Sequence, residues 1–354
     1  MTFPRLSVPI VQAPLGGGPS TPQLPAAVSD AGGLGFLAGG YKSPDALRAD
    51  IRALRALTGR PFGVNVFAPP VAAADPRSYE AYVVRLAAEA RRYDVALGEA
   101  RFDDDAWDAK LELLWEERVA VVSFTYGCPS PEVVEGLAER GTSVWGTVTD
   151  VAEARAAAAA GAHALVAQGV EAGAHRACWV DRDDGPDLAL LPLLQLLGSV
   201  VDLPLVASGG IATGAAVAAV LCAGARAAQL GTAFLRCPEA GTAEVHRDAL
   251  ARPTPTRLTR AFSGRRARSL VNRFVLEHGE AAPSAYPEIH HVTTPLRAAA
   301  RRAGDPNGLS LWAGQTHEMA RTVPAGELVG ALAAEAREAL GRASAVVLET
   351  GGRP

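Results

Sequence analysis

The sequence predicts an α/β fold: a (β/α)8 TIM barrel of eight parallel strands, each followed by a helix, with an additional smaller helical region over the barrel mouth. Three observations lead to this fold class. Short apolar runs alternate with helical stretches along most of the chain. Hydrophobic residues make up 49% of the 354 residues and aromatic residues only 6%, which suits helices packed around a parallel sheet. Polar residues and glycines follow several of the apolar runs, as they do at the working face of such barrels.

The alternation is clearest in the first third of the chain. Its expected elements are the strands 9–15, 34–38 and 62–67 and the helices 23–31 and 44–57. Ser20 and Thr21 stand where a helix N-cap belongs, and Pro22 suits a first helical position. Short links between strand and helix are typical of parallel strands joined by helical crossovers.

Five further strands complete the expected barrel, at 119–125, 143–148, 164–167, 204–207 and 227–230. Thr149 or Asp150 is expected to cap the alanine-rich helix that ends at Gly161. Residues 69–118 interrupt the rhythm and include an acidic segment, 101–108, that is expected to be a mobile loop or lid.

The alternation fades after Cys237, and an amphipathic helix, 327–343, is expected near the end of the chain. The predicted domain organisation is therefore a barrel over residues 1–236, with 69–118 as an insertion, and a C-terminal helical region over residues 237–354. This second region is expected to close back over the barrel mouth and to contribute to the substrate site.

Composition argues against several classes of function. The net charge of −4 and the pI of about 6.0 give no electrostatic basis for binding nucleic acid or an anionic membrane. No uninterrupted apolar run reaches the ~18–20 residues that span a bilayer. No metal site is expected, and the scattered cysteines predict reduced thiols in a cytoplasmic protein: Cys128, Cys178, Cys222 and Cys237.

Two glycine-containing loops follow the last two expected strands. One is Ser208-Gly209-Gly210, and the other is Gly231-Thr232, directly after Gln229-Leu230. In α/β barrels these two loops commonly hold a phosphate through backbone N–H groups. A single tight turn of this kind has no need of a ligand, but the pair at neighbouring strand ends favours phosphate binding.

Polar residues at other strand ends predict what carries that phosphate. Asn65 and Gln168 end apolar strands, and the backbone of Ala13 and Pro14 lies at the end of the first. Such groups suit the hydrogen-bonding edge of a flat heteroaromatic ring, although they also suit the capping of strand ends. FMN, with one phosphate and a flat ring, is the expected cofactor, because no G-x-G-x-x-G opens a dinucleotide-binding unit.

The loop 168–175 is the expected centre of the chemistry. Gly169 and Gly173 allow close backbone approach, and His175 follows. His175 is expected to face the flavin, either as a positive charge opposite an anionic substrate or as a base toward a weak carbon acid. Tyr286 and His290 in the C-terminal region are candidate substrate contacts.

Taken in order along the chain, these motifs resemble the nitronate monooxygenases, formerly called 2-nitropropane dioxygenases, and their class I members in particular. The matching segments are 12–14, 20–22, 31–35, 62–65, 168–175, 207–212, 229–232, 262–268, 272–274 and 311–315. The resemblance implies an FMN enzyme that oxidises alkyl nitronates, propionate 3-nitronate above all, with O2 and without NAD(P)H, giving an aldehyde-type product and nitrite.

The resemblance also implies residue roles. His175 would be the active-site histidine, Gln315 a further candidate substrate contact, and the flavin would be held by residues already singled out: Ala13, Pro14, Asn65, Gln168, Gly173, Gly209, Gly210, Gln229, Leu230, Gly231 and Thr232. The partners would be small molecules only, and the enzyme a monomer or homodimer.

Two positions depart from the family pattern, and two other functions stay open. Leu15 stands where a methionine often follows Ala-Pro, and Ala174 replaces the glycine before the histidine. The second change reduces the freedom of the histidine loop. The alternatives are an NAD(P)H-dependent FMN reductase of the enoyl-acyl-carrier-protein reductase or quinone reductase type, and a barrel that binds a phosphate ligand without catalysis.

Overall fold

The computed structural model describes residues 3–350 and confirms the barrel. Its parallel strands are β1 (Ile10–Gln12), β2 (Phe36–Ala38), β3 (Gly63–Phe67), β4 (Val121–Thr125), β5 (Ser143–Val148), β6 (Ala164–Gln168), β8 (Leu205–Ser208) and β9 (Ala227–Leu230). They pair in the order β1-β9-β8-β6-β5-β4-β3-β2. A parallel bridge between Val11 and Leu34 joins the two ends of the sheet. The barrel therefore closes, and all the strand carboxyl ends meet around one mouth.

The seam between β1 and β2 depends on a buried glutamine. The Gln12 backbone N–H donates to the Leu34 carbonyl oxygen at 2.9 Å. The Gln12 side-chain Oε1 accepts a hydrogen bond from the Phe36 backbone N–H at 3.0 Å. A buried N–H without a partner is costly. The Gln12 side chain therefore accepts from the Phe36 N–H at a point where the short strands β1 and β2 do not pair.

Eight helices pack outside the barrel: α1 (Gln23–Asp30), α2 (Pro44–Leu57), α4 (Trp107–Glu117), α5 (Pro131–Glu139), α6 (Val151–Ala159), α7 (Leu190–Gly198), α8 (Gly214–Cys222) and α12 (Ala325–Thr350). Asp150 caps α6, as expected, by accepting from the Glu153 N–H at 2.9 Å. The cap expected for α1 is wrong: Pro22 occupies the N-cap position, and the Ser20 Oγ accepts from the Leu15 N–H at 2.9 Å instead.

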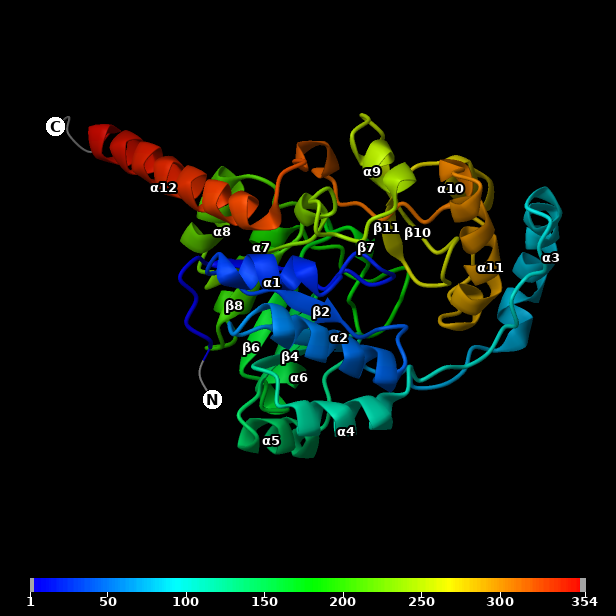
Figure 1. Ribbon diagram of the computed structural model, residues 1–354, viewed down its shortest axis with the longest axis horizontal. Coiled ribbons are helices and arrows are strands. Elements are labelled where there is room, and N and C mark those ends of the chain that lie inside the picture. Colours follow the sequence, from blue (N-terminus) through cyan, green and yellow to red (C-terminus); the bar gives the residue numbers. More distant parts are fainter. Residues whose placement is uncertain (1–2, 351–354) are drawn as a thin grey trace.

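The final helix, α12, belongs to this outer layer and does not lie over the mouth, contrary to the expectation from its sequence. Leu328 and Leu332 are buried in the same apolar cluster as Val217 of α8. The Gly214 N–H at the start of α8 donates to Glu335 Oε2 at 2.9 Å. The C-terminal half of α12 projects away from the body (Figure 1).

A second layer covers the mouth, as predicted. It contains α3 (Pro76–Arg92), α9 (Glu244–Leu250), α10 (Arg273–His278) and α11 (Glu288–Arg302), a three-stranded sheet of β7 (Ala174–His175), β10 (Thr256–Thr259) and β11 (Ala267–Leu270), and the 3-10 turns η1 (Thr232–Phe234), η2 (Pro306–Gly308) and η3 (His317–Met319). In this layer α3, from the insertion, lies beside α11, from the C-terminal region (Figure 1).

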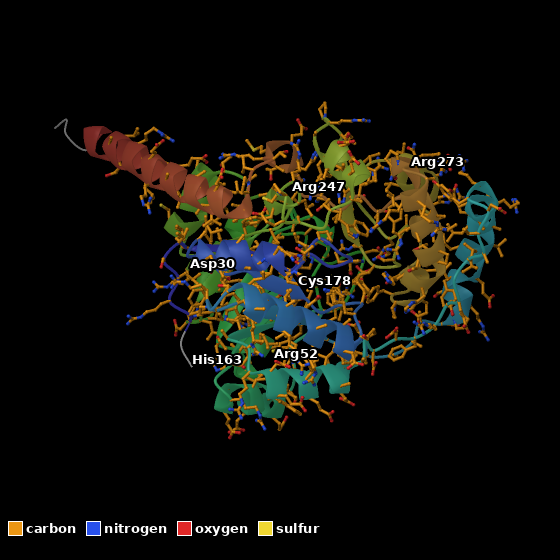
Figure 2. The ribbon with its side chains drawn as sticks, viewed as in Figure 1. Asp30, Arg52, His163, Cys178, Arg247 and Arg273 are labelled. Atoms are coloured by element: carbon orange, nitrogen blue, oxygen red, sulfur yellow. The ribbon has the colours of Figure 1, made fainter. Side chains whose placement is uncertain are left out.

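This layer has its own apolar core and its own ion pairs. Leu86 of α3 packs in one buried cluster with Phe262 and Phe274. Arg273 of α10, labelled in Figure 2, lies on this layer. Its Nη1 and Nη2 reach the buried Glu89 of α3 at 2.6 and 2.7 Å. Insertion and C-terminal region therefore fold together, although about 180 residues separate these two ion-pair partners.

The acidic segment 101–108 is tied to its surroundings. Asp105 pairs with the buried Lys110 at 2.6 Å and accepts from the Tyr41 N–H at 2.9 Å. Asp103 lies 3.3 Å from the His291 Nε2 on α11. These contacts connect the segment to both the barrel and the second layer, and lid motion of the segment stays a prediction.

Candidate active site

A cavity lies where the barrel strands end beneath the second layer. Strand-end residues line its floor, among them Asn65, Ser123, Gln168, Ser208 and Gln229. Residues of the second layer line its walls, among them His175, His290, Arg297 and Trp312. This is the face at which α/β barrels place their chemistry.

The histidine loop leaves β6 at Gln168 and is anchored by that side chain. Gln168 Nε2 donates to the His175 carbonyl oxygen at 3.1 Å, and Oε1 accepts from the Ala177 N–H at 2.9 Å. Arg176 Nη1 also donates to Gln168 Oε1 at 3.1 Å. Both ends of the amide therefore fix the loop, so Gln168 positions His175 more than it presents free polar atoms to a ligand.

Two loop residues have demanding backbone positions. A Cβ on Gly173 would lie 2.5 Å from the Gly314 nitrogen and 2.6 Å from the Ala313 carbonyl carbon, so only glycine fits there. Ala174 has a φ of +62°, in the left-handed region that disfavours a Cβ. The antiparallel pairing of Ala174 with Arg268 and of His175 with Ala267 holds this strained conformation.

His175 stands among aromatic side chains with one polar partner. Its ring centroid lies 5.3 Å from that of Trp312, 5.8 Å from Tyr286 and 6.2 Å from Tyr126. Its Nε2 lies 2.8 Å from the Ser263 Oγ. The Ser263 Oγ also lies 3.2 Å from the Arg265 carbonyl oxygen, so this hydroxyl connects the imidazole to the backbone of the second layer.

The histidine is neutral in this environment. Burial, followed by the positive charges of Arg265 and Arg297, lowers the pKa of His175 to about 3. The positive charge at the site is therefore supplied by arginine. Arg297 lines the cavity, and although burial lowers its pKa to about 10, it stays protonated at neutral pH. Of the two roles expected for His175, the positive charge does not fit this structure, because the imidazole is neutral.

A chain of ring contacts connects Arg297 to the strand ends. Arg297 Nη2 donates to the His290 carbonyl oxygen at 2.9 Å and lies 3.3 Å from the His290 Nδ1. The His290 ring stacks on Tyr41, with centroids 4.2 Å apart and planes 4° from parallel. The Tyr286 hydroxyl donates to the Tyr41 hydroxyl at 3.2 Å. The wall opposite the floor is thus rigid and largely aromatic.

The two glycine loops present unused backbone donors. Gly209 and Gly210 have φ values of +117° and +67°, which glycine tolerates. Within residues 3–350, the N–H groups of Gly209, Gly210, Gly231 and Thr232 donate to no protein acceptor. Thr232 Oγ1 accepts from the Gly314 N–H at 2.9 Å, which fixes the second loop against the C-terminal region. Such a group of free N–H donors fits a phosphate.

The floor of the cavity fits a flat polar ring. Asn65 Nδ2 donates to the Ser123 Oγ at 2.9 Å and to the Thr125 Oγ1 at 3.0 Å, while its Oδ1 has no protein donor among residues 3–350. Gln229 Nε2 lies 3.5 Å from the Ser208 Oγ. The free Asn65 oxygen can accept from a ring N–H, so the residues present fit the hydrogen-bonding edge of a flavin.

Comparison with known proteins identifies the family. The family model for nitronate monooxygenase matches residues 3–335. The chain belongs to the nitronate monooxygenase family. A nitronate monooxygenase of Paraburkholderia phytofirmans is 40% identical over 343 residues, covering 94% of this chain and 93% of that protein. Members of this family are flavin-dependent oxidoreductases, so the chain is an enzyme of this class.

Solved structures show the same architecture. Nitroalkane oxidase from Streptomyces ansochromogenes has a TM-score of 0.93 at 54% identity, covering 95% of this chain and 98% of that one. FabK from Thermotoga maritima has a TM-score of 0.73 at 27% identity, covering 96% of each chain. In residues 3–350 no helix combines the length and apolarity that crossing a membrane requires.

Most of the site residues expected from the sequence line the cavity. Those that line it are Ala13, Pro14, Asn65, Gln168, Gly173, His175, Gly209, Gly210, Gln229, Gly231, Thr232 and His290. Three do not. Leu230 packs between the barrel strands and the outer helices. Tyr286 lies near His175, with ring centroids 5.8 Å apart, but does not line the cavity. Gln315 is exposed, although its neighbours Gly314 and Thr316 line the cavity.

Sequence reasoning missed several residues that shape the site: Tyr41, Tyr126, Ser263, Arg265, Arg297 and Trp312. Tyr41 and Tyr126 follow β2 and β4 closely, and their place at strand ends was a signal that could have identified them. Arg265, whose guanidinium lies 4.0 Å above the Tyr126 ring, belongs to a segment that matches the family. Arg297 had no sequence signal, because only the packing of α11 brings it to the barrel.

Proposed function

We propose that this protein binds FMN and oxidises alkyl nitronates with O2, giving a carbonyl product and nitrite, with His175 as its catalytic residue. The observation that carries the proposal is that a neutral histidine, His175, and a cationic arginine, Arg297, line the same cavity. The free N–H groups after the last two barrel strands, at the same mouth, support the cofactor.

The donors of the glycine loops would hold the FMN phosphate. Gly209, Gly210, Gly231 and Thr232 supply them, and Asn65 Oδ1 would accept from the ring edge. Gln229 would lie beside the ring as a further polar contact. FMN, when bound, supplies the capacity to take electrons from the substrate and to pass them to O2.

The low basicity of His175 favours a nitronate over the neutral nitroalkane. A general base works best when its pKa lies near the operating pH, and a pKa of about 3 makes proton abstraction from carbon weakly driven. A nitronate is already an anion and needs no proton removed. Arg297 would offset the negative charge of the nitronate, and His175 would orient it. The bound nitronate, as a nearby anion, would raise the pKa of His175.

Oxygen uptake by the flavin-loaded protein tests this proposal. Propionate 3-nitronate is added without NADH, and nitrite is measured alongside O2 consumption. Rapid uptake with nitrite release is expected, and the parent nitroalkane is expected to react more slowly. A flavin-loaded protein that consumes no O2 with any nitronate would overturn the proposal.

The reductase alternative keeps one supporting observation, the similarity to FabK at 27% identity over 96% of the chain. Anaerobic addition of NADH or NADPH separates the two functions. Fast bleaching of the flavin absorbance by either nucleotide would favour the reductase, and a stable spectrum would favour the oxygenase. Membership of an enzyme family argues against the non-catalytic barrel.

A further inference from the structure

Arg176 is a buried arginine that lies directly after His175 and faces away from the cavity. Its backbone N–H donates to the Arg266 carbonyl oxygen at 2.8 Å, which continues the extended segment of β7. Successive side chains of an extended segment point to opposite faces. His175 and Ala177 accordingly line the cavity, whereas Arg176 does not and is only 1% exposed. The Arg176 side chain is therefore out of reach of a ligand in the cavity.

The guanidinium group of Arg176 turns back to the start of the histidine loop. Its Nη1 donates to the carbonyl oxygens of Gln168 and Gly169 at 3.1 and 3.0 Å and to the Gln168 Oε1 at 3.1 Å. The same Oε1 accepts from the Ala177 N–H at 2.9 Å, and the Gln168 Nε2 donates to the His175 carbonyl oxygen at 3.1 Å. The two ends of the loop are thus closed on each other around one guanidinium group.

Two further buried arginines hold carbonyl oxygens of the same region. Arg268 donates with Nε and Nη2 to the Val170 carbonyl oxygen at 3.1 and 2.8 Å. Arg265 donates with Nε to the Arg176 carbonyl oxygen at 3.4 Å, and its Nη2 donates to the Cys178 carbonyl oxygen. Burying a charge is costly, and a carboxylate is the usual partner. These guanidinium groups are spent on backbone oxygens instead, which indicates that they maintain the shape of the loop.

An ion pair does not account for the place of Arg176. In the described part of the chain its Nε has no hydrogen-bond partner. The Asp187 carboxylate lies 3.7 Å from this Nε, beyond hydrogen-bond distance, and its side chain is 39% exposed. Asp187 also pairs with Arg266 at 3.2 Å. An exposed carboxylate at such a distance contributes little, so the carbonyl contacts are the main interactions of the buried guanidinium.

We infer that Arg176 is a positioning residue, which closes the histidine loop on itself and thereby sets the place of the His175 imidazole in the cavity. The inference rests on the proposed function, in which His175 orients the nitronate. Charge-assisted hydrogen bonds are roughly twice as strong as neutral ones, so the amide of a glutamine at this position does not replace them. Loss of Arg176 is expected to displace the imidazole and to leave the cofactor donors of the glycine loops in place.

A double-mutant cycle with His175→Asn tests this role. In the wild-type background, Arg176→Gln is expected to lower kcat/KM for propionate 3-nitronate roughly 10- to 100-fold, because a misplacement of about 1 Å can cost that much. The loss should lie mainly in kcat, since Arg297 still offsets the substrate charge. In the His175→Asn background the same change should cost less than about twofold. Equal losses in the two backgrounds would overturn the inference, because Arg176 would then act independently of His175.

Two variants separate positioning from other roles of the charge. Arg176→Lys keeps the charge and should recover part of the loss, and a lysine variant as impaired as Arg176→Gln would overturn the charge-assisted closure. Asp187→Asn removes the neighbouring carboxylate and should stay within about twofold of wild type. A loss in Asp187→Asn as large as that in Arg176→Gln would assign Arg176 to an ion pair instead. If Arg176→Gln does not fold, the cycle is carried out with Arg176→Lys, for which the same dependence on His175 is expected.

Amide hydrogen exchange, followed by mass spectrometry, tests the loop without any turnover. In the flavin-loaded protein, Arg176→Gln is expected to exchange faster than wild type in the peptide that spans residues 168–177 and at the wild-type rate in α6. This result would support the inference even if the protein oxidised no nitronate, an outcome that would overturn the proposed function alone. Unchanged exchange across residues 168–177, or faster exchange throughout the barrel, would overturn the inference whatever the turnover.

Discussion

The imidazole Nε2 of His175 and the hydroxyl oxygen of Ser263 lie 2.8 Å apart, although 88 residues separate them in the chain. His175 comes from the loop after β6, and Ser263 comes from the second layer just before β11. The contact joins the barrel to the layer that covers it. It also holds the imidazole ring in place, and this leads to the first prediction.

Replacing Ser263 with alanine should impair catalysis and leave the flavin bound. Without the Ser263 hydroxyl, the His175 Nε2 loses its hydrogen-bond partner and the imidazole is held less firmly. We expect kcat/KM for a nitronate to fall about five- to tenfold, the effect of one neutral hydrogen bond. Oxygen uptake measures the activity, and flavin absorbance per protein measures the occupancy. Ser199→Ala, at an exposed position on the barrel exterior, is the matched control and should match wild type.

His175→Asn should reduce turnover much further. The asparagine preserves neither the imidazole that would orient the nitronate nor its ring contacts. Misplacing a substrate by about 1 Å can cost roughly 10²-fold in rate. Bound flavin should stay at the wild-type level, because the cofactor donors lie in other loops. Unchanged steady-state kinetics in this variant would remove His175 from the mechanism.

The pH profile of the wild-type enzyme follows from the same residue. The pKa of His175 is lowered to about 3, so the free enzyme stays in one protonation state at this site from about pH 5 to 8. The profile of kcat/KM for a nitronate, which reports on the free enzyme, should therefore show no inflection near pH 6.5. An inflection there that disappears in His175→Asn would show that the histidine titrates near its ordinary pKa.

Buried histidines should also make the fold less stable in acid. Burial lowers the pKa of His246 to about 4, below the ordinary value near 6.5 that it regains on unfolding. The unfolded chain therefore binds more protons between these values, and the free energy of unfolding decreases as the pH falls through this window. His246 alone should contribute a loss of about 2 kcal/mol between pH 7.5 and pH 5.

Urea unfolding of wild type and His246→Asn at both pH values measures this loss. The variant is expected to show a smaller decrease in the free energy of unfolding on acidification, whatever its stability at pH 7.5. Parallel decreases in the two proteins would contradict the assignment. Another histidine, His163, lies at the end of the barrel away from the mouth (Figure 2). Its Nδ1 accepts a hydrogen bond from the Val144 N–H at 2.9 Å.

Ala174→Gly should stabilise the fold. Alanine at a φ of +62° carries a conformational cost of roughly 1–2 kcal/mol that glycine avoids, and part of the gain is offset by the greater entropy of glycine in the unfolded chain. We expect a net gain of about 0.5–1 kcal/mol in the free energy of unfolding. Ala156→Gly, on the exposed face of α6, should have the opposite sign. A destabilised Ala174→Gly would show that the loop requires the alanine methyl group.

The sequence alone determined the barrel and its glycine loops. Each strand is a short apolar run with a local boundary, and each loop residue follows directly from its strand, so position in the chain gives position at the mouth. Gly173, Gly209 and Gly231 could be placed at the site for this reason. His175 could be placed as well, because it follows β6 within one short loop.

Only the tertiary structure decided which charged residues line the site and which segments cover it. Ser263 reaches His175, and Arg297 reaches the cavity that His175 lines, through packing between segments distant in the chain, and no local pattern encodes such placement. The protonation state of His175 depends on burial by that layer, which its own neighbours in sequence do not reveal. The place of α12 beside α8 was likewise decided by tertiary packing, since an amphipathic helix shows that one face is buried but not which surface buries it.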